Sequence, residues 1–354
     1  MSDLHTWILE FHREAAFSED PRQKRIAVLL HRFWLYGGKD YDSDLADLAE
    51  VRDLAEQIGE GRVALFADHW RAQWLLHRKR DYLAARDVVV PAIVEARKPE
   101  YRQLPQRVCL HEDAIQTYIG MDVYGYTPNI EQALAYMDAE IAPNLECRLC
   151  HCGMWLDFAL ETDRLDLADQ WAERYLALSQ SPGLASEHHE TYAHQYLAFI
   201  AARREQWDTV LERAAIGIEL ARRTDQPTVL ADLLAYQALA TLRLGKTNEA
   251  RRMLWAAIKQ ARQDERILDQ GFYNPCCTFY ELDGQSELAL SMRREQLATL
   301  VGRGKTVSEA RCRAEICRLL KLLGQPYEEE LAAAREVANR LAEPARVLHM
   351  LEAF

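Results

Sequence analysis

The stretch LRLGKTNEA, residues 242–250, runs from an apolar segment through a glycine and a short polar turn into a segment rich in alanine and glutamate. Glycine suits the end of a helix, because the residue that closes a helix often takes a left-handed conformation that a Cβ disfavours. The small Ala250 then lets a second helix approach the first closely. This stretch predicts two helices joined by a tight turn.

The same phrase returns about every 40 residues along the chain. Gly284 lies in LDGQSELA and Gly324 in LLGQPYE, each after an apolar segment. Towards the N-terminus the turn can be followed with other residues in the place of the glycine, at Arg80, Asp163 and Glu205, and with a longer turn from Gly125 to Ala133. We expect seven helix-turn-helix units.

Between the turns, apolar residues recur with helical spacing, as at Leu230, Leu233, Leu234, Ala238 and Leu242. No useful length of the chain alternates with the two-residue period of a half-buried strand. The sequence therefore predicts an all-α protein.

The turn phrase, followed by Leu254 and Ala257, resembles the turn and second helix of a tetratricopeptide repeat. The resemblance covers roughly residues 60–340, with a period near 40 instead of about 34. Longer units of this kind are similar to those in the sensor domains of bacterial regulators related to the maltose activator, and the period also suits HEAT-type repeats. The resemblance implies a right-handed superhelical α-solenoid that binds a ligand or a partner.

The ends of the chain are expected to cap this solenoid. Residues 1–60 contain two expected helices, at 3–16 and 22–36, and residues 341–354 contain a short one. Residues 61–340 hold the repeats. Capping is needed because the terminal faces of a solenoid would otherwise expose apolar surface.

Charge and composition narrow the possible partners. The net charge of −12 argues against nucleic acid, which requires basic residues clustered on one face. Arginine pairs at 203–204, 222–223, 251–252 and 293–294 are flanked by acids and predict solvated helix surfaces. The first residues lack the features of a signal peptide, and no segment reaches the ~18 apolar residues of a membrane helix. We expect a cytoplasmic protein without membrane contact.

The stretch CRLCHC, residues 147–152, contains the C-x-x-C-H pattern of covalent haem attachment. Haem attachment needs an oxidising compartment, and no export signal is present. Zinc is the alternative, with Cys147, Cys150 and Cys152 as ligands beside His151, Cys109 or His111. A structural zinc site usually pairs two such knuckles, and only one exists here. Buried thiols and no cofactor are therefore expected.

Other candidate chemistry is weaker. In EHHETYAH, residues 187–194, His189 and His194 are five residues apart, whereas the zinc hydrolase motif places its histidines four apart. The segment GRGKT, residues 302–306, lacks the spacing and the preceding strand of a nucleotide loop. We expect no catalysis.

In a tetratricopeptide-like superhelix the first helix of each unit lines the concave surface. Counting back from the small residue after each turn gives the inward positions: Trp70, Trp74, Arg78, Asp157, Glu161, Tyr192, Gln195, Phe199, Arg203, Asp232, Arg243, Asn274, Arg311 and Arg318. Aromatic side chains beside arginine and asparagine can bind an extended peptide.

Three functions follow as hypotheses. The first is a scaffold that binds a protein or peptide. The second is a sensor in which a small ligand or signal peptide shifts the superhelix between two curvatures. The third is a helical metal enzyme using residues 147–152 and 188–194. The apolar caps also make a homo-oligomer possible.

Overall fold

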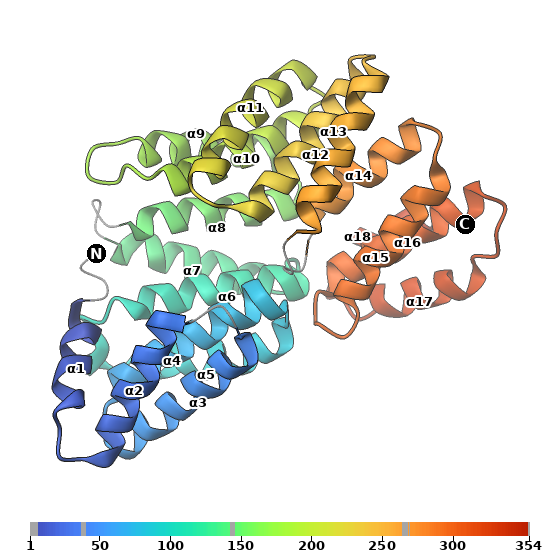
Figure 1. The fold of residues 1–354 in the computed structure, drawn as a ribbon. Helices are drawn as coiled ribbons and strands as arrows, with labels where there is room; N and C mark the ends of the chain where they lie inside the picture. Colours follow the sequence, from blue (N-terminus) through green and yellow to red (C-terminus); the bar gives the residue numbers. More distant parts are fainter. Residues whose placement is uncertain (1–5, 37–39, 142–145, 264–267, 269, 353–354) are drawn as a thin grey trace. The chain divides into compact units, whose positions relative to one another are not determined.

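The computed structural model describes residues 6–36, 40–141, 146–263, 268 and 270–352. Every regular element in these ranges is helical, and none of them is a strand. The prediction of an all-α chain is therefore confirmed, and within each of the two units described below the helices pack in tandem as in a helical repeat (Figure 1).

The described chain forms two compact units. Unit 1 ends at Tyr118 and also includes residues 129–141, whereas unit 2 comprises residues 119–128 and the chain from residue 146 onward. The helices of unit 1 are α1 (Thr6–Ala16), α2 (Pro21–Tyr36), α3 (Tyr41–Gln57), α4 (Gly61–Trp74) with the π-helical turn η2 (Leu75–Lys79), α5 (Tyr82–Ala96), η3 (Pro99–Tyr101), and most of α6 (Gln106–Asp122) and α7 (Thr127–Glu140).

Unit 2 begins with the end of α6 and the start of α7. Its further helices are α8 (Cys147–Glu161), α9 (Leu165–Ser179), α10 (Glu187–Arg203), α11 (Trp207–Arg223), α12 (Pro227–Arg243), α13 (Thr247–Ala261), α14 (Gln270–Leu282), α15 (Ser286–Leu300), α16 (Thr306–Leu322), α17 (Glu328–Ala338), α18 (Ala345–Leu348) and η4 (His349–Leu351).

The seven expected turns each join two helices. The pairs are α4–α5, α6–α7, α8–α9, α10–α11, α12–α13, α14–α15 and α16–α17. Gly245 has φ +82°, as the sequence predicts for a residue that closes a helix. Asp163 and Glu205 have φ +57° in the equivalent turns, so the left-handed backbone persists where the glycine does not.

Packing within unit 2 follows from alanine at the helix crossings. Ala235, Ala238, Ala250 and Ala257 are fully buried in the core around α12, α13 and α14. Helix α12 contacts α10, α11, α13 and α14. A first helix therefore packs both on its own partner and on the first helices of the neighbouring pairs.

In unit 1 the three N-terminal helices continue this packing. Ile8 of α1, Ile26 and Leu30 of α2, and Val51 of α3 share one apolar core with Phe66 of α4. Helix α3 was not identified from the sequence. The division at residues 60 and 340 into caps and repeats stays a prediction.

The arginine pairs differ in exposure. Arg222 and Arg251 are exposed, as expected for solvated helix surfaces. Arg293 is only 8% exposed, so the prediction is wrong for this residue. The reason is its place on α15, where it lies on the same face as the buried Ala289, Gln296 and Leu300.

Candidate functional site

The predicted residues of unit 1 gather with aromatic side chains of α2 and α3. The rings of Trp70 and Trp74 lie 6.1 Å apart, and Phe33 contacts both, at 5.4 and 5.9 Å between centroids. The guanidinium of Arg78 lies over Trp74 and Tyr41, at 5.6 and 5.4 Å. All three predicted residues thus belong to one half-buried aromatic cluster.

In unit 2 the predicted residues form links between first helices. The Tyr196 hydroxyl on α10 donates a 2.7 Å hydrogen bond to Asp157 on α8. Burial and this carboxylate raise the pKa of Tyr196 well above its usual value, so the phenol keeps its proton. Gln195 on α10 donates to Asp232 on α12 at 2.8 Å. The first helices α8, α10 and α12 are therefore linked to their neighbours by side-chain hydrogen bonds.

Aromatic residues accompany these polar links. Phe199 of α10 packs on Tyr236 of α12, with centroids 4.6 Å apart, and both rings are half-buried. Tyr192, also half-buried, lies between the cores on either side of α10. These rings fill the spaces between first helices and keep part of their surface exposed.

Basic residues near the ends of the first helices form ion pairs. Arg203 donates to Asp163 at 2.8 Å and to the Leu160 carbonyl at 3.1 Å. Arg318 on α16 donates to Glu281 on α14 at 2.6 Å. Arg243 instead lies over Trp207, 5.2 Å from its centroid, at the start of the second helix α11.

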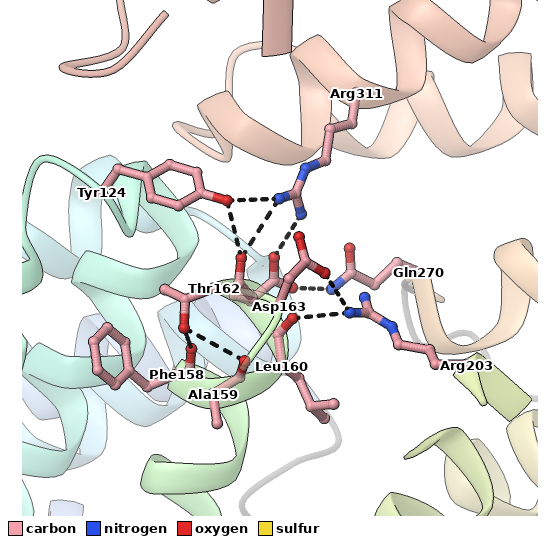
Figure 2. Close-up of polar contacts among 10 residues, drawn as sticks. Tyr124, Phe158, Ala159, Leu160, Thr162, Asp163, Arg203, Gln270 and Arg311 are labelled. Carbon is pink, nitrogen blue, oxygen red and sulfur yellow. Dashed lines mark hydrogen bonds and ion pairs between the residues drawn. The ribbon is translucent and has the colours of Figure 1, made fainter. Parts of the chain in front are cut away.

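A polar cluster joins helices that are far apart in the sequence (Figure 2). Arg311 on α16 donates to the Glu161 carboxylate at the end of α8 over 3.0 Å. It also donates to the Tyr124 hydroxyl, which in turn donates to the Glu161 carbonyl, at 3.1 and 3.3 Å. Gln270 at the start of α14 donates to the second carboxylate oxygen. We call these four residues the Glu161 cluster.

This cluster requires strong curvature of unit 2. Four steps separate α8 from α16 through α10, α12 and α14, and packed helices lie about 8–10 Å apart. A straight stack would therefore hold α8 and α16 on the order of 40 Å apart. Side chains bond directly instead, so the first helices lie on the concave side of unit 2. The sequence identified Glu161 and Arg311 but not Tyr124 or Gln270, which stand outside the counted positions.

The predicted Asn274 contacts a third residue that the sequence did not identify as part of the site, Arg293. The Asn274 side-chain oxygen accepts a 2.7 Å hydrogen bond from Arg293 of the second helix α15. Arg293 was missed because only first helices were counted. A polar residue on the apolar face of a second helix was the available signal.

The cysteine stretch lies in α8. Cys147 and Cys152 are buried and Cys150 is half-buried. Over the described ranges, no group of three or more His, Cys, Asp and Glu side chains is arranged to hold a metal ion.

Histidines of the 187–194 segment make ordinary helix contacts. The Tyr175 hydroxyl and His189 Nδ1 are 2.7 Å apart. Burial and the neighbouring His188 lower the pKa of His189 to about 4. His194 is 3% exposed, and burial lowers its pKa as well. Both rings are therefore neutral at pH 7.

Comparisons with known proteins support the fold. No protein-family model matches the sequence, and no curated protein matches it either. Among solved structures, the apo form of the quorum sensor NprR from B. thuringiensis is similar, with a TM-score of 0.59 and 14% sequence identity over 94% of this chain and 91% of that one. Together with the helix pairs, this confirms a tetratricopeptide-like helical repeat fold. In the described part of the chain, no helix is both long and apolar enough to cross a membrane.

Proposed function

We propose that the protein binds a peptide, or an extended segment of a partner protein, on the concave side of unit 2 and acts through this binding without catalysis. The observation that carries the proposal is the contact between Glu161 and Arg311, because it makes the first helices the inner side of a curved stack. A concave surface can surround an extended chain and bury more of it than a flat one.

The chemistry of this side suits a peptide. Half-buried aromatic rings, such as those of Phe199 and Tyr236, supply apolar contact at a small cost in side-chain entropy. Similarity in fold to a quorum sensor is in keeping with this proposal.

The test is selection from a randomised heptapeptide library, with retained peptides identified by mass spectrometry and measured individually by calorimetry. Phe199→Ala should weaken binding about tenfold or more, because an aromatic anchor is removed. Trp255→Ala is the matched control, since Trp255 is 69% exposed on the second helix α13. Equal loss in both variants, or retention of no peptide by the wild type, would refute the proposal.

A sensor role is the second candidate. The Glu161 cluster exists only while helices α8 and α16 are close. A ligand that binds preferentially to a less curved form of unit 2 would therefore break the hydrogen bonds of this cluster. Such a ligand should accelerate amide hydrogen exchange in the turn after α8. Unchanged exchange there under saturating ligand would leave only the scaffold function.

A further inference from the structure

Arg293 is a buried cation without an anionic partner in the described part of the chain. It is 8% exposed, and its Nη1 donates to two neutral acceptors, Asn274 Oδ1 at 2.7 Å and Gln296 Oε1 at 2.8 Å. Its Nε is buried and makes no hydrogen bond there.

The neighbouring thiols do not neutralise this charge. The Cys312 thiol donates to the Arg293 carbonyl over 3.3 Å, and Cys277 lies in the same environment. Burial raises the pKa of Cys312 to about 12 and that of Cys277 to about 11, so both thiols remain neutral. A cation next to a thiol usually favours the thiolate, but here desolvation is the larger effect.

Carboxylates act on Cys276 and Cys277 together with Arg293, but each of these carboxylates bonds to a group other than Arg293. Asp232 accepts from Gln195 at 2.8 Å, and Glu295 accepts from the Tyr273 hydroxyl at 3.2 Å. Glu281 and Glu315 both pair with Arg318. In the described residues Arg293 therefore bonds only to neutral side chains, and part of its hydrogen-bonding capacity is unused.

The position of this arginine connects it with the proposed binding surface. Arg318 and Glu281 pair across α16 and α14 with an offset of 37 residues. The same offset places Asn274 opposite Arg311, so Arg293 reaches the first helices at the level of the Glu161 cluster. Arg311 already has a carboxylate from Glu161, whereas Arg293 has none.

We propose that Arg293, with Asn274 and Gln296 beside it, forms a subsite that binds a carboxylate of the peptide ligand. A guanidinium binds a carboxylate through two parallel hydrogen bonds, and Nε together with a second nitrogen offers this geometry. The carboxylate comes either from an aspartate or glutamate side chain or from the C-terminus of the peptide. This inference rests on the proposed function only in taking the ligand to be a peptide.

The peptide test uses the same heptapeptide library in two forms, with a free C-terminus and with a C-terminal amide. Enrichment of Asp and Glu in both forms assigns an acidic side chain, and retention of the free form alone assigns the C-terminus. Arg293→Met should weaken the retained peptides about tenfold or more, equivalent to about 1.4 kcal/mol. Arg313→Met is the control, because the Arg313 side chain is only 15% exposed but already pairs with Glu309 and Glu330.

A direct measurement separates this inference from the proposed function. In protein labelled with ¹⁵N-arginine, the Nε–H resonance of Arg293 should shift on titration with sodium acetate and remain in place with sodium chloride of equal ionic strength. If peptides bind and neither the preference for acids nor this shift is seen, the subsite is refuted and the proposed function stands. If acetate shifts the resonance and no peptide is retained, the proposed function fails and the subsite stands.

Discussion

Replacing Arg311 by methionine tests whether the Glu161 cluster holds the curvature of unit 2. The change removes the hydrogen bonds from Arg311 to the Glu161 carboxylate, to the Glu161 carbonyl and to the Tyr124 hydroxyl. A hydrogen bond to a charged group contributes about 1.5–3 kcal/mol when it is buried. The side chains of Arg311 and Glu161 are 26% and 15% exposed, so hydrogen bonds to water replace part of the lost free energy in the variant. We expect a loss of about 2 kcal/mol.

For a unit of this size, 1 kcal/mol changes Tm by about 2–4 °C, so calorimetry should show a decrease of about 4–8 °C. The double-mutant cycle with Glu161→Gln should give a coupling energy of about 1 kcal/mol or more, because the two residues share one network. Arg340→Met is the control. Arg340 and its partner Glu336 are 62% and 69% exposed, and such pairs contribute little. A Tm change as small as that of the control, or additive single mutants, would show that the cluster does not maintain the curvature.

Three other outcomes follow from the described contacts. Glu205→Gly should raise the free energy of unfolding by about 0.5–1 kcal/mol in urea titrations, because Glu205 has φ +57°, a backbone that glycine adopts without strain. The reciprocal Gly245→Glu should lower the free energy of unfolding by a similar amount. A change of the same sign in both variants would contradict this reasoning. Asp113→Ala should lower the free energy of unfolding by about 3 kcal/mol, since the fully buried Asp113 carboxylate lies 2.8 Å from His69 Nδ1 and accepts a hydrogen bond from Gln73. A free energy of unfolding near that of the wild type in urea titrations would contradict this prediction. The pKa of His189 is about 4 in the folded protein against 6.5 in the unfolded chain, so the unfolded state binds the proton first as pH falls. This difference contributes stability that is present above pH 6.5 and is lost as pH falls towards 4. His189→Gln should therefore reduce the fall in Tm between pH 7 and 5, and an unchanged dependence of Tm on pH would assign that fall to other groups.

Periodic features of the chain were predictable from sequence. Gly245, Gly284 and Gly324 mark turns through backbone conformation alone, and the same step located Asp163 and Glu205, whose backbones are also left-handed. A local rule repeated along the chain therefore identifies the helix pairs. The same counting placed Asp157, Gln195 and Phe199 on surfaces where neighbouring first helices meet.

Features that depend on accumulated geometry were not predictable in this way. The bond between Glu161 and Arg311 spans 150 residues and exists because small rotations between pairs add up to strong curvature. No sequence interval encodes that sum. Helix α3 was missed for a different reason. The Asp40 side chain caps this helix by accepting a hydrogen bond from the Ser43 backbone N–H, but no glycine turn of the repeat type precedes it.

Buried charge identifies a binding position better than aromatic content does. Phe199 and Tyr236 pack on each other in the unliganded protein, so their presence is explained by stability whether or not a ligand exists. Arg293 also bonds within the free protein, to Asn274 and Gln296, but its Nε makes no hydrogen bond in the described residues. In the proposed subsite the peptide supplies a carboxylate to this unused donor. In the proposed function the aromatic rings define where the peptide lies, and in the proposed subsite Arg293 defines which chemical group it carries.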